Sequence, residues 1–484
     1  MEEEINHLTG DLRVKKLVEF LIAAVITVVV WNLPAQTFGI EGLTVVQQRV
    51  IAIFVFATLM WLTEAVPAWA TSLGIITLML LTTSNHSFAF FQDDAGGNLG
   101  TLLKSKDIMA TFADPIIILF LGGFILAIAA SKSGLDLYLA KSLLHPFGHK
   151  SDRVLLGFIL ITGIFSMFVS NTATAAMMLT FLAPVFKALP ANGKGRIALT
   201  LSIPVAANLG GMATPIGTPP NAIALKYLNA HDGLNLGIGF GQWMMIMLPY
   251  VLVLLVISWL LLKKFFPFSQ KTIDLEIKGE VTHNWRTVVV AVATILLWML
   301  DKVTGIDANT VAMVPMGVFA ITGVITASDL QKINWSVIWM VAGGFALGLG
   351  LKDTGLADAA IESIPFGQWS PLVIILISSL ICYVLSNFIS NTATAALLVP
   401  ILATVCTGMG DTLMGGGSAI VLIGVAIAAS SAMCLPISTP PNAIAHSTGL
   451  VKQGEMLKIG LIVGIISLAL GYAVLYFAGT FNLL

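Results

Sequence analysis

The chain has 484 residues, of which 57% are hydrophobic and only 10% are charged, and its mean hydropathy is +0.94. A water-soluble protein of this length could not cover its apolar core with so few charged residues, so the composition excludes a soluble globular protein. The formal net charge of −1 gives no support for nucleic-acid binding. We therefore predict an all-α polytopic membrane protein embedded in a lipid bilayer.

Apolar runs that can span most or all of about 30 Å of hydrocarbon recur along the chain. Residues 1–16 are polar and mixed in charge, and no small-residue cleavage site follows the first apolar run. We interpret that run as a retained span rather than a signal peptide. In chain order, the 11 predicted transmembrane helices are 17–34, 46–63, 68–83, 112–131, 197–216, 238–262, 287–304, 309–327, 335–351, 417–437 and 458–480.

Two further apolar stretches, 154–190 and 371–408, have the wrong shape for a single span. Each carries the same polar motif near its middle, Phe168-Val-Ser-Asn-Thr-Ala-Thr-Ala-Ala176 in the first and Phe388-Ile-Ser-Asn-Thr-Ala-Thr-Ala-Ala396 in the second. A polar turn between two apolar arms is typical of a re-entrant hairpin. We predict that each stretch is a helix–turn–helix hairpin that enters the membrane and returns on the same side.

The distribution of Lys and Arg predicts the orientation, because cytoplasmic loops of membrane proteins are rich in these residues. With the N-terminus inside and both hairpins re-entrant, the outside segments retain only Arg49, Lys104, Lys106, Lys226, Lys302 and Lys352 of the 24 Lys and Arg residues. Counting either hairpin as a single span would remove this asymmetry. The first hairpin is therefore predicted on the cytoplasmic side and the second outside, as in an inverted-topology repeat.

A second motif pair extends the repeat, Gly217-Thr-Pro-Pro-Asn-Ala-Ile-Ala224 and Ser438-Thr-Pro-Pro-Asn-Ala-Ile-Ala445. The double proline breaks a helix, because proline lacks a backbone donor and clashes with the preceding turn. We predict N-terminal membrane helices over 1–111, a first repeat over 112–262, a cytoplasmic linker over 263–286 and a second repeat over 287–484.

The four motif segments contain no Lys, Arg, Asp, Glu or His. A pocket built from them must bind a neutral solute, or an anion together with a cation that compensates its charge. Carbonyl, amide and hydroxyl oxygens suit sodium, whereas N–H groups and hydroxyls suit a carboxylate. The pattern predicts two cation sites flanking one anion site. No intramembrane metal set or activated serine supports an enzyme.

The paired Ser-Asn-Thr hairpins and paired Thr-Pro-Pro-Asn breaks resemble the divalent anion/sodium symporter family. Leu121-Gly-Gly-Phe124, its counterpart Ala342-Gly-Gly-Phe345 and Trp61-Leu-Thr-Glu-Ala-Val-Pro67 extend the resemblance over nearly the whole chain. The resemblance implies a bacterial sodium-coupled dicarboxylate transporter of the inner membrane. It also implies a homodimer in which a transport domain moves like an elevator against a scaffold domain, with residues 1–111 mainly in the scaffold.

The resemblance also assigns roles by position. The first sodium site would use Ser166, Ser170, Asn171 and the backbone at Gly217, and the second would use Ser386, the backbone at Ile389, Asn391 and Ser438. Ile389 and Ser438 depart from the pattern, which usually has a small residue and an alanine there. The substrate carboxylates would meet Ser170, Asn171, Thr172, Ser390, Asn391 and Thr392, with Thr218, Pro219, Thr439 and Pro440 lining the pocket.

Import of a C4-dicarboxylate such as succinate with at least two sodium ions is the function that these features favour. Exchange of one dicarboxylate for another on the same fold remains an alternative, as do citrate and sulfate as substrates. The motifs do not distinguish these substrates, because the width of the pocket depends on packing.

Overall fold

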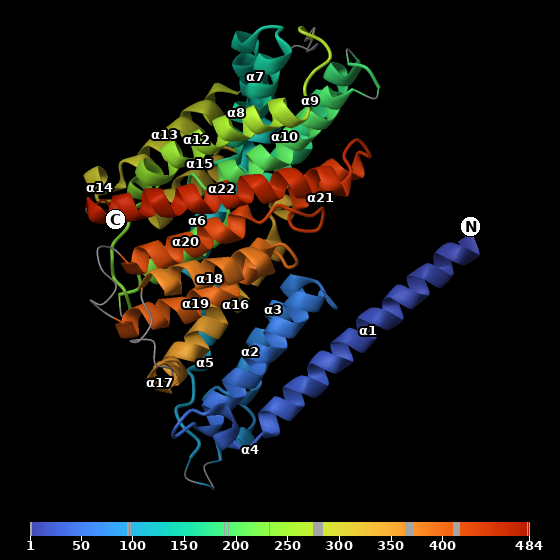
Figure 1. The fold of residues 1–484 in the computed structure, drawn as a ribbon. Coiled ribbons are helices and arrows are strands. Elements are labelled where there is room, and N and C mark those ends of the chain that lie inside the picture. Colours follow the sequence, from blue (N-terminus) through green and yellow to red (C-terminus); the bar gives the residue numbers. More distant parts are fainter. Residues whose placement is uncertain are drawn as a thin grey trace.

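The computed structural model describes residues 2–93, 96, 98–187, 189–191, 193–231, 233–273, 284–363, 371–409, 417–481 and 483. Within these ranges the regular elements are all helices, accompanied by two isolated β-bridges (Figure 1). The predicted all-α fold is confirmed.

The chain begins with α1 (Glu2–Asn32), α2 (Val45–Thr63) and α3 (Ala68–Thr82), followed by the short helices α4 (Ala89–Gln92) and α5 (Ser105–Ala110). Thr44 and Gln47 cap α2 reciprocally, since each side chain bonds the backbone N–H of the other residue. Helix α1 packs along α2, and its N-terminal part extends away from the body of the protein (Figure 1).

Two series of seven helices follow one another in matching order along the chain. The first series is α6 (Pro115–Lys132), α7 (Leu135–Leu144), α8 (Ser151–Ser166), α9 (Asn171–Lys187), α10 (Lys194–Gly211), α11 (Pro219–Leu228) and α12 (Phe240–Phe265). The second series is α16 (Trp335–Asp353), α17 (Leu356–Ser363), α18 (Pro371–Ser386), α19 (Asn391–Met409), α20 (Gly417–Ser431), α21 (Pro440–Ser447) and α22 (Gln453–Thr480). Between the series lie α13 (Trp285–Met299), α14 (Asp301–Thr304) and α15 (Ala308–Ile321).

The two series interlock around a shared core. Helices α8 and α9 form one hairpin that packs on α10, and α18 and α19 form the other, which packs on α20. Each short helix after a break packs on the opposite series, α11 on α19 and α20, and α21 on α9 and α10. The long helix before each series also packs on the opposite series: α3 packs on α16, and α15 packs on α6. Both breaks therefore point toward the centre of the molecule.

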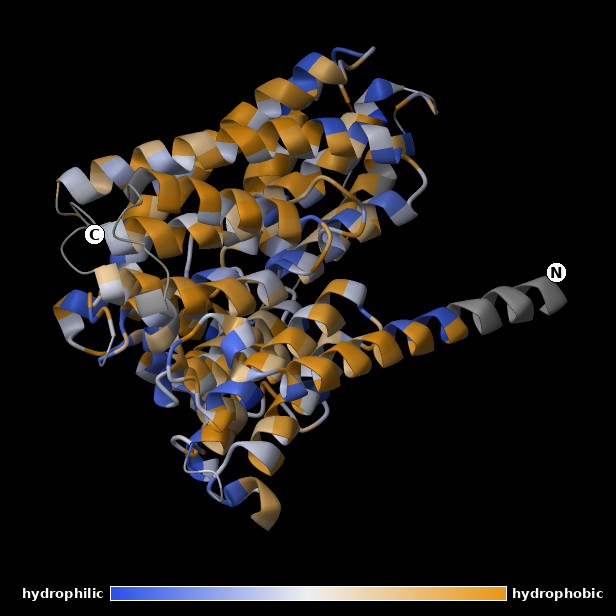
Figure 2. Ribbon diagram, turned by 60° about the horizontal axis from the view of Figure 1, so that its bottom comes forward, coloured by the Kyte–Doolittle hydropathy of each residue, from blue (hydrophilic) through white to orange (hydrophobic). Residues whose placement is uncertain are grey.

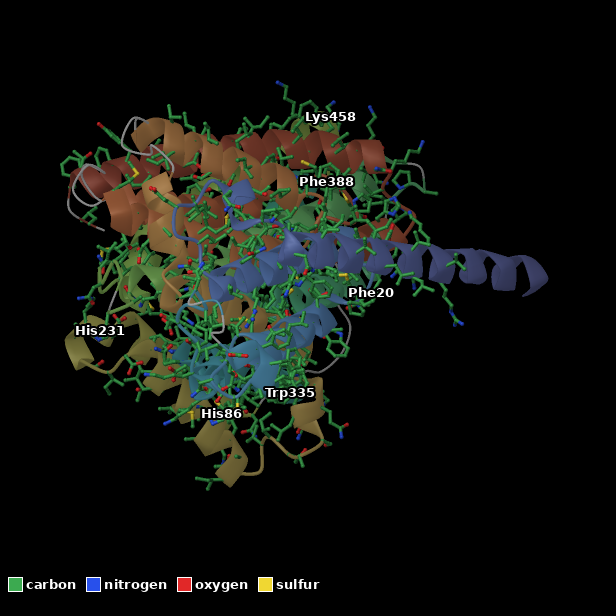
Figure 3. The ribbon with its side chains drawn as sticks, turned by 90° about the horizontal axis from the view of Figure 1, so that it is seen from below. Phe20, His86, His231, Trp335, Phe388 and Lys458 are labelled. Atoms are coloured by element: carbon green, nitrogen blue, oxygen red, sulfur yellow. The ribbon has the colours of Figure 1, made fainter. Side chains whose placement is uncertain are left out.

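A helix occupies each of the 11 predicted spans. By length and composition, six helical segments in the described ranges can cross a membrane: Val45–Thr63, Ser105–Lys132, Phe240–Phe265, Trp335–Asp353, Asn391–Met409 and Gln453–Thr480. Hydrophobic residues make up most of the length of the helices, and hydrophilic residues lie mainly at helix ends and in loops (Figure 2). Exposed aromatic residues such as Phe20 on α1 and Phe388 at the second hairpin turn present apolar surface to the surroundings (Figure 3). The chain is a multi-pass membrane protein.

Some predicted boundaries differ from the observed ones. Helices α10 and α20 end at Gly211 and Ser431, five and six residues before the predicted ends of their spans. Helix α1 begins at Glu2, well before the predicted start at residue 17. In the predicted linker, residues 274–283 lie outside the described residues.

Candidate substrate and cation site

A pocket of about 180 Å³ lies where the two hairpin turns meet the two helix breaks. We call it the central pocket. All ten residues predicted to bind substrate line it, namely Ser170, Asn171, Thr172, Thr218, Pro219, Ser390, Asn391, Thr392, Thr439 and Pro440. A pocket of this size suits a compact organic solute. The structure thus brings together residues that lie far apart in the chain.

Four helix N-termini converge on the central pocket. Helices α9, α19, α11 and α21 begin at Asn171, Asn391, Pro219 and Pro440, and all four of these residues line the pocket. A helix N-terminus carries a partial positive charge and unpaired N–H groups, and both favour an anion. None of the lining residues carries a charged side chain. Positive potential in the pocket therefore comes from backbone dipoles.

The hairpin turns supply the backbone donors. Within the described residues, the N–H groups of Thr172 and Thr392 have no hydrogen-bond acceptor, because they lie in the first turns of α9 and α19. Helices α11 and α21 begin with two prolines each and therefore lack these first donors. On the α11 and α21 side, hydroxyl groups are the available hydrogen-bond donors.

The geometry that the two breaks share depends on the asparagine that follows the prolines in each. Asn221 Nδ2 donates to the carbonyls of Gly211, Met212 and Thr214 at 2.8 to 3.2 Å. Asn442 Nδ2 likewise donates to two carbonyls of the turn after α20, at 2.8 and 3.0 Å. These bonds satisfy carbonyls that the interrupted helices leave unpaired, so irregular backbone can lie buried in the protein.

The first predicted cation site is a cluster of oxygens behind the first hairpin turn. Ser166 Oγ lies 2.7 Å from Asn171 Oδ1 and 2.8 Å from the carbonyl oxygen of Ala207. The same end of the Asn171 amide also faces the carbonyl of Gly217 at 3.2 Å. With its nitrogen turned inward, this amide donates to all three oxygens; with its oxygen inward, four oxygens converge. The second arrangement fits a hard cation.

The second cluster repeats the first almost atom for atom. Ser386 Oγ lies 2.9 Å from Asn391 Oδ1 and 3.1 Å from the carbonyl oxygen of Ala429. A hydroxyl group has one hydrogen and cannot donate to two oxygens at once. In the second cluster, and in the first when the Asn171 oxygen points inward, oxygens therefore outnumber the serine hydrogen that separates them, and a cation would remove the mismatch.

Ile389 and Ser438 make none of the contacts that join Ser386 and Asn391 in the second cluster. Ile389 is 3% exposed and, like Ser166 and Ser386, lies behind the pocket rather than in its lining, so the prediction for its backbone stays a prediction. Ser438 lines the pocket, but its hydroxyl donates to the carbonyl of Asn387 at 2.9 Å and accepts from Leu435 N at 3.0 Å. The Ser438 side chain therefore holds the turn after α20 against the second hairpin.

Sequence reasoning missed the residues that complete the pocket. An apolar wall comes from α6 and α16, which contribute Phe120, Phe124, Val337 and Met340. Asn208 on α10 and Asn334, which caps α16, are the polar lining residues outside the four motif segments. Apart from Phe124 in the Gly-Gly-Phe motif, these residues lie outside the repeated motifs. An asparagine inside an apolar span is the one signal that could have indicated Asn208.

A second cavity of about 550 Å³ adjoins the central pocket, and we call it the vestibule. Phe124, Ser170 and Asn334 line both spaces, so the pocket and the vestibule lie next to each other beside the first hairpin. The rest of the vestibule is mainly apolar. Lys132 and Lys332 contribute positive charge to its lining, and Asp136 contributes a negative charge.

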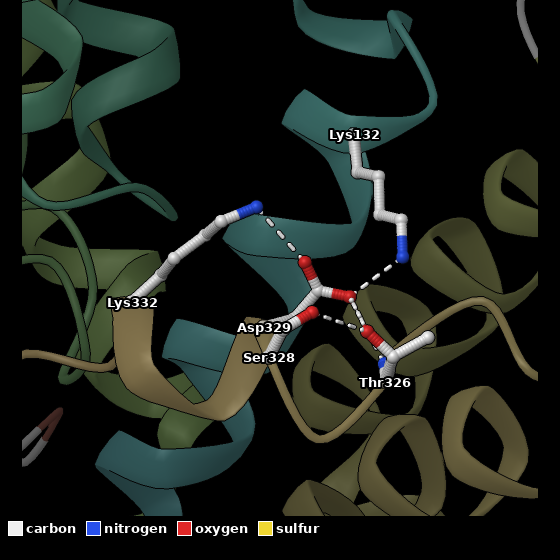
Figure 4. Close-up of polar contacts among 5 residues, drawn as sticks. All are labelled: Lys132, Thr326, Ser328, Asp329 and Lys332. Carbon is white, nitrogen blue, oxygen red and sulfur yellow. Dashed lines mark hydrogen bonds and ion pairs between the residues drawn. The ribbon is translucent and has the colours of Figure 1, made fainter.

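A buried carboxylate holds the two lysines of the vestibule (Figure 4). Asp329 is 2% exposed and accepts from Lys132 Nζ at 2.6 Å, Lys332 Nζ at 2.9 Å and both the N–H and the hydroxyl of Thr326. The Lys132 ammonium and these other donors keep the pKa of Asp329 far below its usual range. The loop after α15 is thereby tied to the end of α6.

A second ion pair lies beyond the pocket along α11. Lys226 Nζ lies 2.7 Å from Asp114 Oδ2 and 3.4 Å from the centre of the Phe345 ring. Asp114 also caps α6 by accepting from Ile116 N. This cluster joins the second half of a broken helix to the apolar wall formed by α6 and α16.

Known proteins resemble the chain in both sequence and fold. It is 31% identical over 469 residues to the sodium-dependent dicarboxylate transporter SdcS of Staphylococcus saprophyticus, covering 88% of this chain and 85% of the relative. SdcS of Staphylococcus aureus strain USA300 is also 31% identical, over 467 residues with the same coverage.

Two solved structures share the fold at low sequence identity. The YdaH transporter of Alcanivorax borkumensis has a TM-score of 0.57 and 11% identity, covering 86% of this chain and 99% of that one. MtrF of Neisseria gonorrhoeae has a TM-score of 0.53 and 13% identity, with 84% and 94% covered. The model of the citrate transporter family matches residues 58–415. This transport protein therefore belongs to the citrate transporter family, in agreement with the resemblance to divalent anion/sodium symporters read from its motifs.

Proposed function

We propose that the protein imports C4-dicarboxylates, such as succinate, together with at least two sodium ions. One observation carries the proposal: a pocket without charged side chains lies between four helix N-termini and adjoins two matching oxygen clusters. The N-termini suit carboxylates, and the clusters suit sodium. The names of the staphylococcal relatives agree with this pairing.

Charge compensation would couple the two solutes. A dianion leaving water for this pocket loses hydration, and dipoles alone offset that cost poorly. Sodium at the clusters behind Asn171 and Asn391 would place positive charge beside both hairpin turns. The same two side chains line the pocket, so each asparagine can orient toward a cation and a carboxylate together. We propose that sodium binds first and the dicarboxylate second.

The pocket has a polar side and an apolar side, and we propose that in an elevator movement the polar side slides along the apolar one. The hairpins and broken helices supply nearly all polar groups, whereas α6 and α16 supply Phe120, Phe124, Val337 and Met340. An apolar wall holds few directional bonds to the substrate, which favours sliding of the polar unit along it. We assign the hairpins and broken helices to the transport domain, and α1 to α6 with α13, α15 and α16 to the scaffold.

In this assignment the vestibule leads from the pocket to the cytoplasm. It lies beside the first hairpin, for which the distribution of Lys and Arg predicts a cytoplasmic position. The pair formed by Lys226 and Asp114 lies toward the predicted outer side and joins the transport domain to the scaffold. We propose that the protein is a homodimer of the bacterial inner membrane, as in the family that its motifs resemble.

Citrate is the principal alternative substrate, because the family model that matches residues 58–415 is that of a citrate transporter. Sulfate and exchange of dicarboxylates without net sodium movement are further alternatives. Proteoliposomes test these together through uptake of labelled succinate under an inward sodium gradient or an equal potassium gradient. Uptake that requires sodium and is inhibited by C4-dicarboxylates is expected. Uptake without sodium that requires internal dicarboxylate would instead establish an exchanger, and stronger inhibition by citrate or sulfate would reassign the substrate.

A further inference from the structure

Asn208 lies on α10 and joins the two halves of the protein at the central pocket. Its side-chain nitrogen contacts Thr439 Oγ1 at 3.1 Å and Asn442 Oδ1 at 3.3 Å, both on the break of the second series. Asn208 is 1% exposed and contributes to the pocket lining. This bridge is polar, buried and adjacent to the bound solute in the proposed function.

The neighbouring bonds fix which end of each amide points where. Asn442 Nδ2 donates to the carbonyls of Met433 and Leu435, so Asn442 Oδ1 must face Asn208. That oxygen requires a donor, which only the nitrogen end of the Asn208 amide provides. The orientation of Asn208 therefore follows from two backbone carbonyls and is not free to reverse.

The consequence falls on the hydroxyl of Thr439. Its oxygen accepts from Asn208 Nδ2 at 3.1 Å and from the backbone N–H of Asn442 at 3.3 Å. A hydroxyl oxygen has two acceptor sites and one hydrogen, so both acceptor sites are used. Among the described residues the Thr439 hydrogen has no acceptor, and Thr439 lines the pocket. The hydroxyl is left as a hydrogen-bond donor toward the substrate.

We infer that Asn208 is a positioning residue that orients the Thr439 hydroxyl as a donor for a substrate carboxylate. The inference rests on the proposed function and specifies one hydrogen bond to the substrate, with the Thr439 hydroxyl as the donor. A donor with both lone pairs occupied favours a carboxylate oxygen over groups that would need an acceptor.

The first half of the protein lacks this arrangement. Thr218, the counterpart of Thr439, makes no hydrogen bond to the first turn of its helix, whereas Thr439 accepts from Asn442 N. Asn221 donates only to backbone carbonyls there. The two ends of the pocket are therefore unequal, and the Thr439 end is the one with a fixed donor.

An asparagine at position 208 destabilises the fold in a way that a residue with only a packing role would not. Asn208 Oδ1 is buried and has no hydrogen-bond partner within the described residues. An unpaired buried acceptor destabilises a protein, and an apolar side chain would remove it. The nitrogen of the same amide supplies a donor to Thr439, which gives a reason for keeping an asparagine here.

A double-mutant cycle tests the inference through the KM for succinate at saturating sodium. We expect Thr439→Val to raise KM at least tenfold, because a hydrogen bond to a charged group is lost, and Asn208→Ala to raise it about three- to tenfold, because the hydroxyl remains but can turn away. In the double variant KM should match that of Thr439→Val within about twofold. If the two increases instead multiply, Asn208 does not act through Thr439 and the inference fails.

Two further variants separate positioning from packing. Asn208→Leu keeps most of the volume without a donor, so its KM should rise as in Asn208→Ala; a wild-type KM would show that only volume matters. Asn309→Ala is the matched control, because Asn309 on α15 also has an unpartnered buried oxygen but does not line the pocket. Its KM should equal that of the wild type. Succinate transport by the wild type is required throughout, and its absence would refute the proposed function rather than the role of Asn208.

Discussion

Gly211 offers the sharpest test of the first cation cluster, because one added methyl group would displace one of its oxygens. A Cβ at residue 211 would lie 2.6 Å from Asn171 Oδ1 and 3.0 Å from the carbonyl oxygen of Gly217. Ordinary contact begins at 3.4 Å, so the Asn171 oxygen would have to move by 0.8 Å to restore it, the difference between 3.4 and 2.6 Å. Gly211→Ala thus perturbs the cluster without changing any charge.

The expected magnitude follows from the cost of overpacking. Forcing a methyl group into a well-packed site costs about 1–3 kcal/mol. If sodium binding bears that cost, the sodium concentration for half-maximal uptake rises about 5- to 150-fold. Sodium-dependent succinate uptake into proteoliposomes measures this shift directly, with succinate held at saturation.

Gly317→Ala provides the matched control. Gly317 lies within α15, where an added Cβ would meet nothing within 4 Å. The same chemical change should leave the sodium dependence unchanged there. An unaltered sodium dependence in Gly211→Ala, with normal protein yield, would refute the assignment of the first cluster as a sodium site.

Three further outcomes follow from the structure. Ser386→Ala should raise the half-maximal sodium concentration about tenfold by removing an oxygen from the second cluster, measured by uptake at saturating succinate; an unchanged value would remove Ser386 from the ligand set. Ala127→Trp should fill part of the vestibule and lower the maximal transport rate at least tenfold, while equilibrium succinate binding to the purified protein persists; normal transport would show that the solute takes another path. Asp329 has a lowered pKa, so its ion pairs stabilise the fold above the unfolded value near pH 4 and are lost as pH falls toward the folded value. The melting temperature of the wild type should fall between pH 7 and pH 3, and it should fall less in Asp329→Asn. If the melting temperatures of the two proteins fall in parallel with pH, this reasoning is contradicted.

The repeated motifs made the fold predictable because proline, glycine and asparagine have local effects that need no knowledge of packing. Pro219 and Pro440 start helices where the sequence predicts breaks. The ends of α10 and α20 were harder to predict, since the apolar composition continues into the turns. Side-chain amides from Asn221 and Asn442 satisfy the carbonyls there, and such partners lie beyond the reach of a hydropathy pattern.

The pocket was predictable to the extent that its residues repeat. The repetition of the Ser-Asn-Thr motif indicated that both turns have the same role, and the structure places both at one pocket. Asn208 has no partner of this kind, because its role depends on a contact with Thr439, 231 residues away. Phe120 and Met340 could not be predicted either, since the sequence pattern does not distinguish an apolar residue that faces a pocket from one that faces lipid.

Ser438 and its counterpart in the first half, Gly217, differ in what the side chain can contact. In the first half, the Thr214 hydroxyl donates to the carbonyl of Met167. In the second half, the Ser438 hydroxyl donates to the carbonyl of Asn387, which occupies the position that corresponds to Met167, 220 residues earlier. The turn after the helix is thus bonded to the hairpin in both halves, but the donor hydroxyl comes from a different position in each turn. Since this bond uses the only hydrogen of the Ser438 hydroxyl, the serine replaces Thr214 as a structural tie.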